Sequence, residues 1–467
     1  MAKAKNLNMT ERPLFFGMIR FAIPLILTSV LQIVYNMADS IVVGKFSGDY
    51  NALGAVGSAG ALTTLITNVM ISLSAGAGVV IAQLYGAKDE KEVSRTAHTS
   101  MGISVIGGIL MMIIGFIISR PVLDAMGTLP VYIDKAVLYM QIICIGIPAS
   151  AVYNFGASIL RASGDSKTSL YILSASGLIN IVLNFILVVF FNMAVAGVAI
   201  STVISQYMSA VAVIFVLMKR KNESYCISLK KIRVEKRILK RVLRIGLPMT
   251  FQSLLFSLSG VIISTSVNTF TPVVVEAKTI AFSIESITAT ILTAFANTAI
   301  TFVGQNYGAK KFSRINKIFL LALIQVTAAG ILVSQIEIFF GRELSMLYID
   351  KTNPDGAAIV DAVMEIFKIM LAPYFLCGVM EVVSGVLKAL GYTVRSMIGS
   401  LIGLAVRILW VILIVPIPKF HTIPGLFVSY LLAWGVTIAV DLIFCAEVWR
   451  KLGIFKLAKA EKEICKI

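Results

Sequence analysis

The most constraining feature of this sequence is a set of apolar runs, each near or above 20 residues, that recurs from one end to the other. Each run is long enough to cross a bilayer whose hydrocarbon core is roughly 30 Å thick. Only 14% of the 467 residues are charged, whereas soluble proteins are charged on about a quarter of their residues. A soluble helical protein needs a polar face on most helices, and the polar residues here are too few. The sequence therefore predicts an all-α integral membrane protein.

Twelve transmembrane helices are predicted, with glycine and proline inside many of them, as transporter helices tolerate. An even number of spans puts both termini on one side of the membrane. The expected spans are residues 15–43, 52–82, 96–119, 136–159, 168–191, 195–218, 242–269, 277–303, 315–340, 361–387, 394–415 and 424–447.

The basic residues indicate the orientation. The side of the membrane that holds both termini collects 32 of the 41 Lys and Arg residues, and the other side collects eight. This is a positive-inside bias, so both termini are expected in the cytoplasm. The formal net charge of +17 is thus an orientation signal, with contact to anionic lipid, and nucleic acid is not an expected partner.

The second half of the chain repeats the first. IRFAIPLILTSVLQ parallels LRIGLPMTFQSLL, IAQLYGAKDEKEV parallels FVGQNYGAKKFSRI, and GASILRASGDSKTS parallels VSGVLKALGYTVRS. We predict two six-helix lobes related by a pseudo-two-fold axis along the membrane normal, as in other secondary transporters with parallel repeats. The expected parts are an N-lobe of residues 1–218, a basic cytoplasmic linker of residues 219–241, and a C-lobe with the cytoplasmic tail, residues 242–467.

Two local patterns carry structural expectations. The end of the basic stretch is amphipathic, with Ile232, Leu239 and Val242 among basic residues, so it is either a helix lying in the membrane surface or a plain linker between the lobes. The QLYGAK and QNYGAK segments close the second and eighth spans. Their glycines suit a helix end and a tight turn.

The sequence shows no arrangement of residues that would support enzyme chemistry. The two histidines, His98 and His421, are far apart, and no nucleophile elbow or phosphate-binding loop is present. The cysteines are odd in number and form no CxxC motif, which argues against a disulfide framework and a zinc site; they are Cys144, Cys226, Cys377, Cys445 and Cys465. No removable signal peptide is expected at the start. We expect neither an enzyme nor a protein with a cofactor.

A carboxylate interrupts the first apolar run. In QIVYNMADSIVVGK, Asp39 follows Tyr35 and Asn36 by about one helical turn. An ionisable side chain within a span is costly unless it faces water or partners, so it predicts a functional site. The alternative is an acid at the membrane interface that only accepts hydrogen bonds.

Other polar side chains of the first half fall at helical spacing. Asn180 and Asn184 share one face of the fifth span, and Thr202 and Gln206 share one face of the sixth. With Asp39, the two asparagines and Thr202 can line a small polar chamber that binds a proton or coordinates a small cation such as Na⁺. The alternative is that they hold the helices together, as polar side chains in membranes also do. The remaining polar residues, Tyr35, Asn36 and Gln206, are expected in the substrate cavity or in gating.

The second half carries its own charges within spans. Glu285, Glu381 and Arg407 are expected in the substrate cavity or in gating. An unpaired arginine there is costly, so we expect an acid partner for Arg407, with Glu381 as the first candidate and Glu285 as the second. Glu285 is alternatively a counter-charge for a cationic substrate. Glu337 falls near a span end and is expected at the interface, and Asp441 is given no role.

The sequence resembles the multidrug and toxic compound extrusion (MATE) family over about residues 13–450. The matching segments are IPLILTSVLQIVYNMADSIVVGK, ALGAVGS, SAGAGVVIAQLYGAKD, YNFGASILRASGDSKTS and FVGQNYGAKK, in this order. The resemblance implies a two-lobed antiporter of twelve helices. Such proteins expel organic, often cationic, compounds in exchange for inward H⁺ or Na⁺.

The resemblance also implies roles for single residues. Asp39 matches the acid of the family's first helix, Asn180 its fifth-helix amide and Thr202 its sixth-helix hydroxyl. Asn184 departs from members that have a second aspartate there, and the seventh span offers Gln252 and serines where some members carry a glutamate. The coupling ion is therefore left open between H⁺ and Na⁺.

The expected function is secondary active export of organic compounds by a monomeric carrier, by alternating access between two lobes, in the plasma (inner) membrane. The bilayer and small organic substrates are its expected partners. The main alternative is a lipid-linked saccharide flippase of related architecture, which would need a strongly cationic cleft for pyrophosphate. An uncoupled receptor or channel is a further alternative, which the repeat within one chain disfavours.

Overall fold

The computed structural model describes residues 9–11, 13–47, 51–349 and 353–454, and every regular element among them is helical. Twelve helices in this part of the chain are long and apolar enough to cross a membrane, which confirms the predicted fold class. The first six are α1 (Leu14–Phe46), α2 (Ala52–Gly86), α3 (Glu90–Ala125), α4 (Pro130–Ala162), α5 (Lys167–Phe185) and α6 (Ala194–Lys219).

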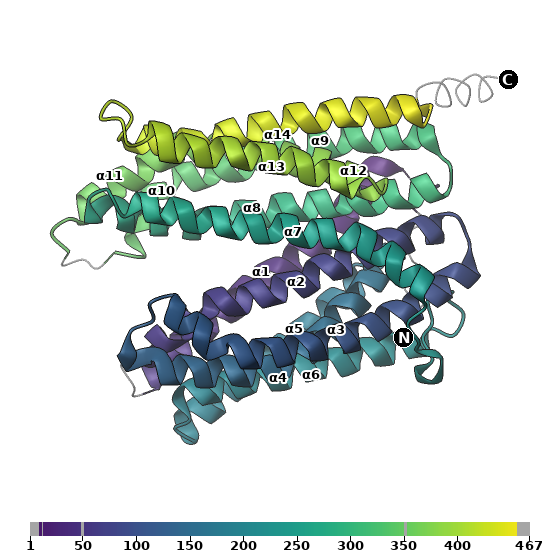
Figure 1. Cartoon of the computed structure of the whole chain (residues 1–467), viewed down its shortest axis with the longest axis horizontal. Coiled ribbons are helices and arrows are strands. Elements are labelled where there is room, and N and C mark those ends of the chain that lie inside the picture. Colours follow the sequence, from purple (N-terminus) through teal and green to yellow (C-terminus); the bar gives the residue numbers. More distant parts are fainter. Residues whose placement is uncertain (1–8, 12, 48–50, 350–352, 455–467) are drawn as a thin grey trace. The chain divides into compact units, whose positions relative to one another are not determined.

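The second half adds six more spans and one short helix (Figure 1). The tenth span is composite, since α11 (Gly356–Ile366) continues through a π-helical segment (Phe367–Leu371) towards α12 (Phe375–Ala389). A short helix, α10 (Gly341–Met346), precedes it. The other spans are α7 (Lys236–Val267), α8 (Pro272–Gly308), α9 (Phe312–Phe339), α13 (Thr393–Leu409) and α14 (Ile423–Lys451).

The chain forms two compact units, which we call the N-lobe and the C-lobe. Among the described residues, the N-lobe contains those of 23–250, and the C-lobe contains those of 9–22 and 251–454. Helices α1 and α7 are therefore each shared between the lobes. Pro24 lies inside α1 and Pro248 inside α7, each within a few residues of the change of lobe. The expected boundaries at residues 218 and 242 differ from this division, because the first half of α7 packs with the N-lobe.

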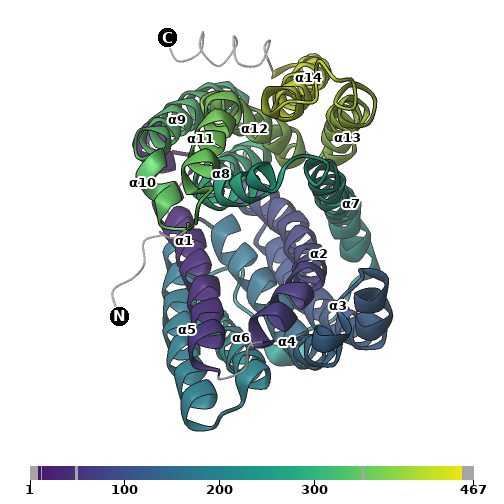
Figure 2. The same cartoon turned by 90° about the vertical axis from the view of Figure 1, so that its left-hand side faces the viewer.

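In the N-lobe, α4 is the central helix, packed against α2, α3 and α6. Figure 2 views these helices nearly end-on. Small residues permit close approach. A methyl group added at Gly76 of α2 would lie 2.6 Å from the Cα of Gly246 on α7, and one added at Gly108 of α3 would lie 2.6 Å from the Cα of Pro148 on α4.

The linker after α6 is folded against the N-lobe. Tyr225 and Ile227 are buried in it, and the amide of Ser228 donates a 3.0 Å hydrogen bond to Nε2 of His98 on α3. Because Nε2 accepts, the ring proton of His98 lies on Nδ1, which is 2.7 Å from the carbonyl oxygen of Ser94.

Hydrogen bonds and ion pairs between charged side chains hold the last residues of the linker. Burial alone would raise the pKa of Glu235, but hydrogen bonds from Arg233 and the nearby charge of Arg95 hold that pKa below its usual range. Helix α7 begins at Lys236, inside the predicted linker, and Val242 is fully buried within the protein. These contacts favour the interpretation as a linker over that of a helix on the membrane surface.

In the C-lobe, α12 is the central helix, packed against α8, α9, α13 and α14. Helices α13 and α14 run side by side (Figure 1), with glycine at the contact. A methyl group added at Gly403 of α13 would lie 2.6 Å from the carbonyl oxygen of Ala433 on α14. Residues 9–22 join this lobe: Asn306 of α8 donates to the carbonyl oxygen of Met9, and the rings of Phe21 and Phe302 pack edge to face.

The sequence repeat is reproduced in the backbone. In the turns after α2 and α8, backbone amides at equivalent positions donate to carbonyl oxygens at equivalent positions. Lys88 and Lys310 both adopt left-handed conformations, with φ of 57° and 56°. Gly86 and Gly308 are the last residues of their helices, as expected of a helix end, while the left-handed position of each turn is taken by lysine and not by glycine. π-Helical segments also recur, at Ile186–Phe190 after α5 and at Trp410–Ile414 after α13. Such segments are frequent at functional sites.

Candidate functional site

Asp39 lies in a hydrogen-bonded cluster inside the N-lobe. The side-chain amide of Asn184 on α5 donates to Oδ1 of Asp39, and the amide oxygen of Asn184 accepts from the hydroxyl of Ser201 on α6. Asn184 and Ser201 are completely buried, while Asp39 is half-buried. One amide thus connects three helices. Sequence reasoning missed Ser201, although it directly precedes Thr202.

The second amide extends the cluster. Asn180 lies one turn before Asn184 on α5, and its side-chain oxygen is 3.4 Å from the Nδ2 donor of Asn184. Its own Nδ2 donates to the hydroxyl of Thr202 over 3.4 Å. The structure therefore brings together all four residues that were predicted to couple to an ion: Asp39, Asn180, Asn184 and Thr202.

Tyrosines enclose the cluster. The ring of Tyr35 on α1 packs onto Gly177 of α5, where an added methyl group would lie 2.0 Å from the ring, and its hydroxyl donates to the carbonyl oxygen of Ser174 over 3.3 Å. Tyr139 of α4 is buried and lies close enough to interact electrostatically with Asp39. Only the fold reveals Tyr139, because α4 carries no polar pattern that leads to α1.

Two predicted residues lie outside the cluster. Asn36 is exposed. Gln206 turns towards α4, where a methyl group added at Gly146 would lie 2.0 Å from its Oε1 atom. That oxygen is buried and accepts no hydrogen bond. The spacing of Thr202 and Gln206 placed both on one helical face. In the structure, Thr202 contacts α5 through Asn180, whereas Gln206 turns towards α4.

The cluster has one carboxylate, two amides and two hydroxyls. Carboxylate oxygens accept only, so the donor from Asn184 matches an ionised Asp39. If Asp39 takes up a proton, its new O–H needs an acceptor, and rotation of the Asn184 amide supplies one at the cost of the bond from Ser201. Proton binding at α1 is thereby linked to the contact between α5 and α6.

The C-lobe holds a second carboxyl group, Glu285 of α8, which accepts a hydrogen bond from the hydroxyl of Tyr374. Aromatic rings surround this pair. Tyr374 packs edge to face on Trp434 with ring centroids 5.2 Å apart, and Trp434 packs on Tyr430. The ring of Phe282, one turn before Glu285, lies 5.9 Å from that of Tyr430. A carboxylate among aromatic faces is an arrangement that binds organic cations.

The expectation of an acid partner for Arg407 is wrong. Its guanidinium donates from Nε to the hydroxyl of Ser259 over 3.1 Å and from Nη2 to the same atom over 2.5 Å. Its Cζ atom lies 4.5 Å from the centre of the Tyr430 ring. A hydroxyl and an aromatic face thus stabilise the cation. Among the described residues, neither Glu381 nor Glu285 forms an ion pair with it.

Glu337 is also placed differently from the expectation. It was assigned to the interface, yet its side chain is only 5% exposed inside the C-lobe. Its Oε2 atom accepts from the hydroxyl of Thr288 on α8 over 2.7 Å. Glu381 is half-buried on α12. The C-lobe therefore contains more buried acid than the sequence pattern indicated.

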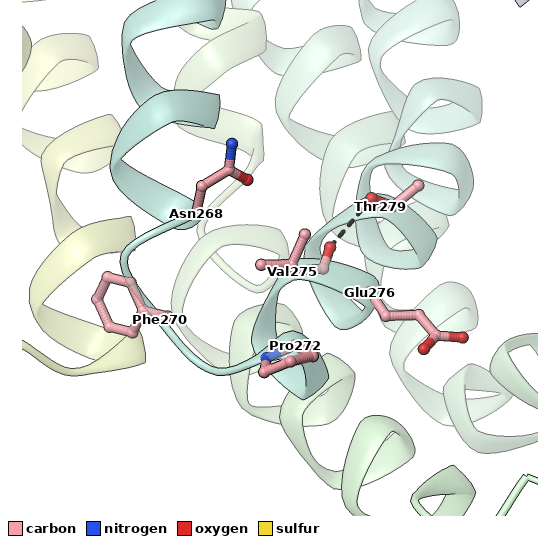
Figure 3. A pocket seen from close by; sticks show the side chains of 6 residues that line it. All are labelled: Asn268, Phe270, Pro272, Val275, Glu276 and Thr279. Atoms are coloured by element: carbon pink, nitrogen blue, oxygen red, sulfur yellow. Dashed lines mark hydrogen bonds between the residues drawn. The ribbon is translucent and has the colours of Figure 1, made fainter.

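A cavity of 490 Å³ lies where α7 joins α8 (Figure 3), lined by Asn268, Phe270, Pro272, Val275, Glu276 and Thr279. Thr279 bonds back to the carbonyl oxygen of Val275 over 3.0 Å. Glu276 is the one charged lining residue and is exposed. Because few polar groups converge here, the cavity is a weaker candidate than the two clusters.

Comparisons with known proteins agree on one family. The chain is 26% identical over 450 residues to the probable multidrug resistance protein YoeA of Bacillus subtilis, covering 94% of each chain. It is 22% identical over 429 residues to the multidrug export protein MepA of Staphylococcus saprophyticus, covering 91% of this chain and 90% of the relative.

Solved structures share the fold. An outward-facing multidrug resistance MATE family transporter of the MOP superfamily superposes with a TM-score of 0.87 at 20% identity, covering 96% of this chain and 99% of that one. A MOP superfamily transporter from Pyrococcus furiosus gives 0.86 at 20% identity, covering 97% and 98%.

The family model assigns the identity. It matches residues 24–186 and 248–413, one segment in each half of the repeat. Twelve apolar helices and bacterial relatives make the chain a multi-pass protein of the plasma membrane. The flippase alternative finds no support in these comparisons. The chain belongs to the MatE family of multidrug efflux transporters, which are not enzymes.

Proposed function

We propose that the protein is a secondary antiporter that exports organic compounds in exchange for an inward cation, with Asp39 as the coupling group. The observation that carries the proposal is the connection of Asp39 on α1 to Ser201 on α6 through one amide, Asn184. A change of charge at Asp39 alters the hydrogen bonds of three helices at once. A coupling site needs this property, because ion binding must change the conformation.

The cluster supports H⁺ over Na⁺ as the coupling ion. A Na⁺ site requires several oxygen ligands turned towards the ion. Rotation of the Asn184 amide would turn its oxygen towards a bound ion of either kind, so the choice rests on charge, and Asp39 is the one carboxylate of the cluster. A proton needs one carboxylate oxygen and one acceptor, which Asp39 and a rotated Asn184 amide supply. The second aspartate of related transporters is an amide in this chain, so less negative charge is present to bind a metal ion.

One coupled proton provides enough driving force for export. A single charge that moves through 100 mV gains about 2.3 kcal/mol. Since 1.4 kcal/mol is a factor of ten, that gain would support a roughly 45-fold gradient of a neutral compound at equilibrium. Exchange of one H⁺ for one monovalent organic cation moves no net charge, so its export is driven by the pH gradient, about tenfold per pH unit.

The exported compounds are proposed to be organic cations, and Glu285 of the C-lobe is proposed to bind them. Its oxygen accepts from Tyr374, and a bound cation replaces that donor while the rings of Trp434 and Tyr430 contact its apolar parts. Asp39 and Glu285 lie in different lobes. Ion binding in one lobe and substrate binding in the other are linked when the two lobes alternate between outward-open and inward-open states.

The test is transport of a fluorescent cationic dye by purified protein in liposomes, with a pH gradient and a Na⁺ gradient imposed separately. We expect the pH gradient to drive the dye in wild type, and Asp39→Asn to abolish this. The control is Asp134→Asn, the same chemical change at a side chain that is 78% exposed. It should transport like wild type.

Other outcomes contradict parts of the proposal. Full coupling in Asp39→Asn shows that Asp39 is structural. Transport driven only by the Na⁺ gradient would refute H⁺ as the coupling ion but would agree with an antiport mechanism. Absence of dye movement under either gradient in wild type contradicts export of organic cations.

A further inference from the structure

Another buried carboxyl group, Asp441 of α14, is unused by the function proposed above. Its side chain is fully buried in the C-lobe. The Oδ2 atom accepts a hydrogen bond from the hydroxyl of Ser384 on α12. The Oδ1 atom is buried and has no hydrogen-bond partner among the described residues. An ionised carboxylate with a bare oxygen is unfavourable in such surroundings, whereas a protonated one is tolerated.

The surroundings of Oδ1 are specific. A methyl group added at Gly399 of α13 would lie 1.9 Å from Oδ1, so the acid occupies a place that only glycine leaves open. Ser396 lies three residues earlier, on the same face of α13, and its hydroxyl is also buried without a partner. Two unpartnered polar atoms therefore lie about one turn apart along the contact between α13 and α14.

The charges of the neighbouring helices do not balance. Glu381, Ser384 and Lys388 lie on one face of α12, and the ammonium of Lys388 interacts electrostatically with both Glu381 and Asp441. Two carboxyl groups thus face one ammonium. The nearby Arg395 of α13 is engaged with Glu447 over 2.6 Å. Neutrality of the buried group requires one additional positive charge.

We propose that Asp441 is a second proton-binding site, which takes up and releases its proton independently of Asp39. The proton adds to Oδ1, which has no partner, and Ser384 keeps its bond to Oδ2. A metal ion fits less well, since it needs several oxygen ligands, whereas a proton supplies the missing positive charge and needs only the one free oxygen, Oδ1. Proton binding here does not depend on transport, but a contribution to the driving force rests on the proposed antiport.

The test measures protonation directly, with no gradient and no substrate. Infrared spectra of the full-length protein in lipid nanodiscs are recorded across a pH series, and the carbonyl stretch of protonated carboxyl groups is followed. In Asp441→Asn we expect this band to lose the amplitude of one carboxyl group. Asp361→Asn, a side chain that is 65% exposed and paired with Arg342, should lose none of the buried component.

Two further variants make the result decisive. Ser384→Ala removes the hydroxyl that stabilises the ionised form, so the Asp441 component should persist to a higher pH than in wild type. In Asp39→Asn the Asp441 component should remain. The proposal is refuted if the band is the same in wild type and Asp441→Asn. If Asp441→Asn does not fold, an unchanged titration in Ser384→Ala refutes it. Loss of the component in Asp39→Asn also refutes it, because the band then belongs to Asp39.

Discussion

At the scale of single residues, the side chains around the acid differ between the two lobes. In the N-lobe the acid is surrounded by amides and hydroxyls, so its charge is met by donors that can rotate. In the C-lobe Glu285 is surrounded by tyrosine, tryptophan and phenylalanine, whose faces attract cations. Polar groups that can rearrange suit a small ion, and aromatic faces suit an organic one.

The substrate assignment predicts a loss of affinity in Glu285→Gln. A hydrogen bond or contact with a charged group contributes about 1.5–3 kcal/mol, so binding of a tetraphenylphosphonium cation should weaken by roughly ten- to a hundred-fold. Titration calorimetry on the purified protein measures this. Glu276→Gln, at an exposed acid of the same helix, is the control. Equal affinity in Glu285→Gln and wild type contradicts the assignment.

At the scale of helices, close packing depends on glycine at a few contacts. Gly76 of α2 meets Gly246 of α7 backbone to backbone within the N-lobe, and the nearest atoms cannot rotate away. Other glycines of the same helix have open space around them, among them Gly60. Composition does not distinguish the two kinds, since both lie in apolar helical sequence.

Gly76→Ala should therefore destabilise the protein. The added methyl group would lie 2.6 Å from the Cα of Gly246, and overpacking of this kind costs about 1–3 kcal/mol. Gly60→Ala meets nothing within 4 Å and should be neutral or stabilising by up to about 1 kcal/mol, since alanine favours the helix. Thermal unfolding in detergent compares the two. An equal melting temperature for both variants would show that α2 and α7 do not pack as described.

At the scale of the whole molecule, the number of helices and the basic loops determine the orientation in the membrane. Six spans precede the linker and six follow it. The linker is basic and folded against α3 through His98 and Ser228. A folded basic segment between two sets of spans is typical of the cytoplasmic side.

Reporter fusions test this orientation. Alkaline phosphatase is active only outside the cytoplasm, so a fusion after Lys451 should be inactive, and one after Asn192, between α5 and α6, should be active. A green fluorescent protein fused at the same positions should give the opposite pattern. Activity of the Lys451 phosphatase fusion would show that the C-terminus is outside and would reverse the expected direction of transport.

The sequence by itself determined the class of fold, the number of spans and four residues of the N-lobe cluster. The length of each apolar run is read directly from the sequence, and the thickness of the bilayer fixes how long a membrane-spanning run must be. Asp39, Asn180, Asn184 and Thr202 were found because a polar group within an apolar run is costly and so has a reason to be there.

Only the tertiary structure decided which polar groups meet. In the N-lobe, Ser201 and Tyr139 belong to the cluster and Gln206 lies outside it. In the C-lobe, Arg407 contacts Ser259 and Tyr430, and the carboxyl group of Asp441 lies against Gly399. Helical periodicity gives the face on which a side chain lies but not the helix that covers this face. Partners on different helices depend on packing between those helices, and the glycines that permit this packing look alike in the sequence.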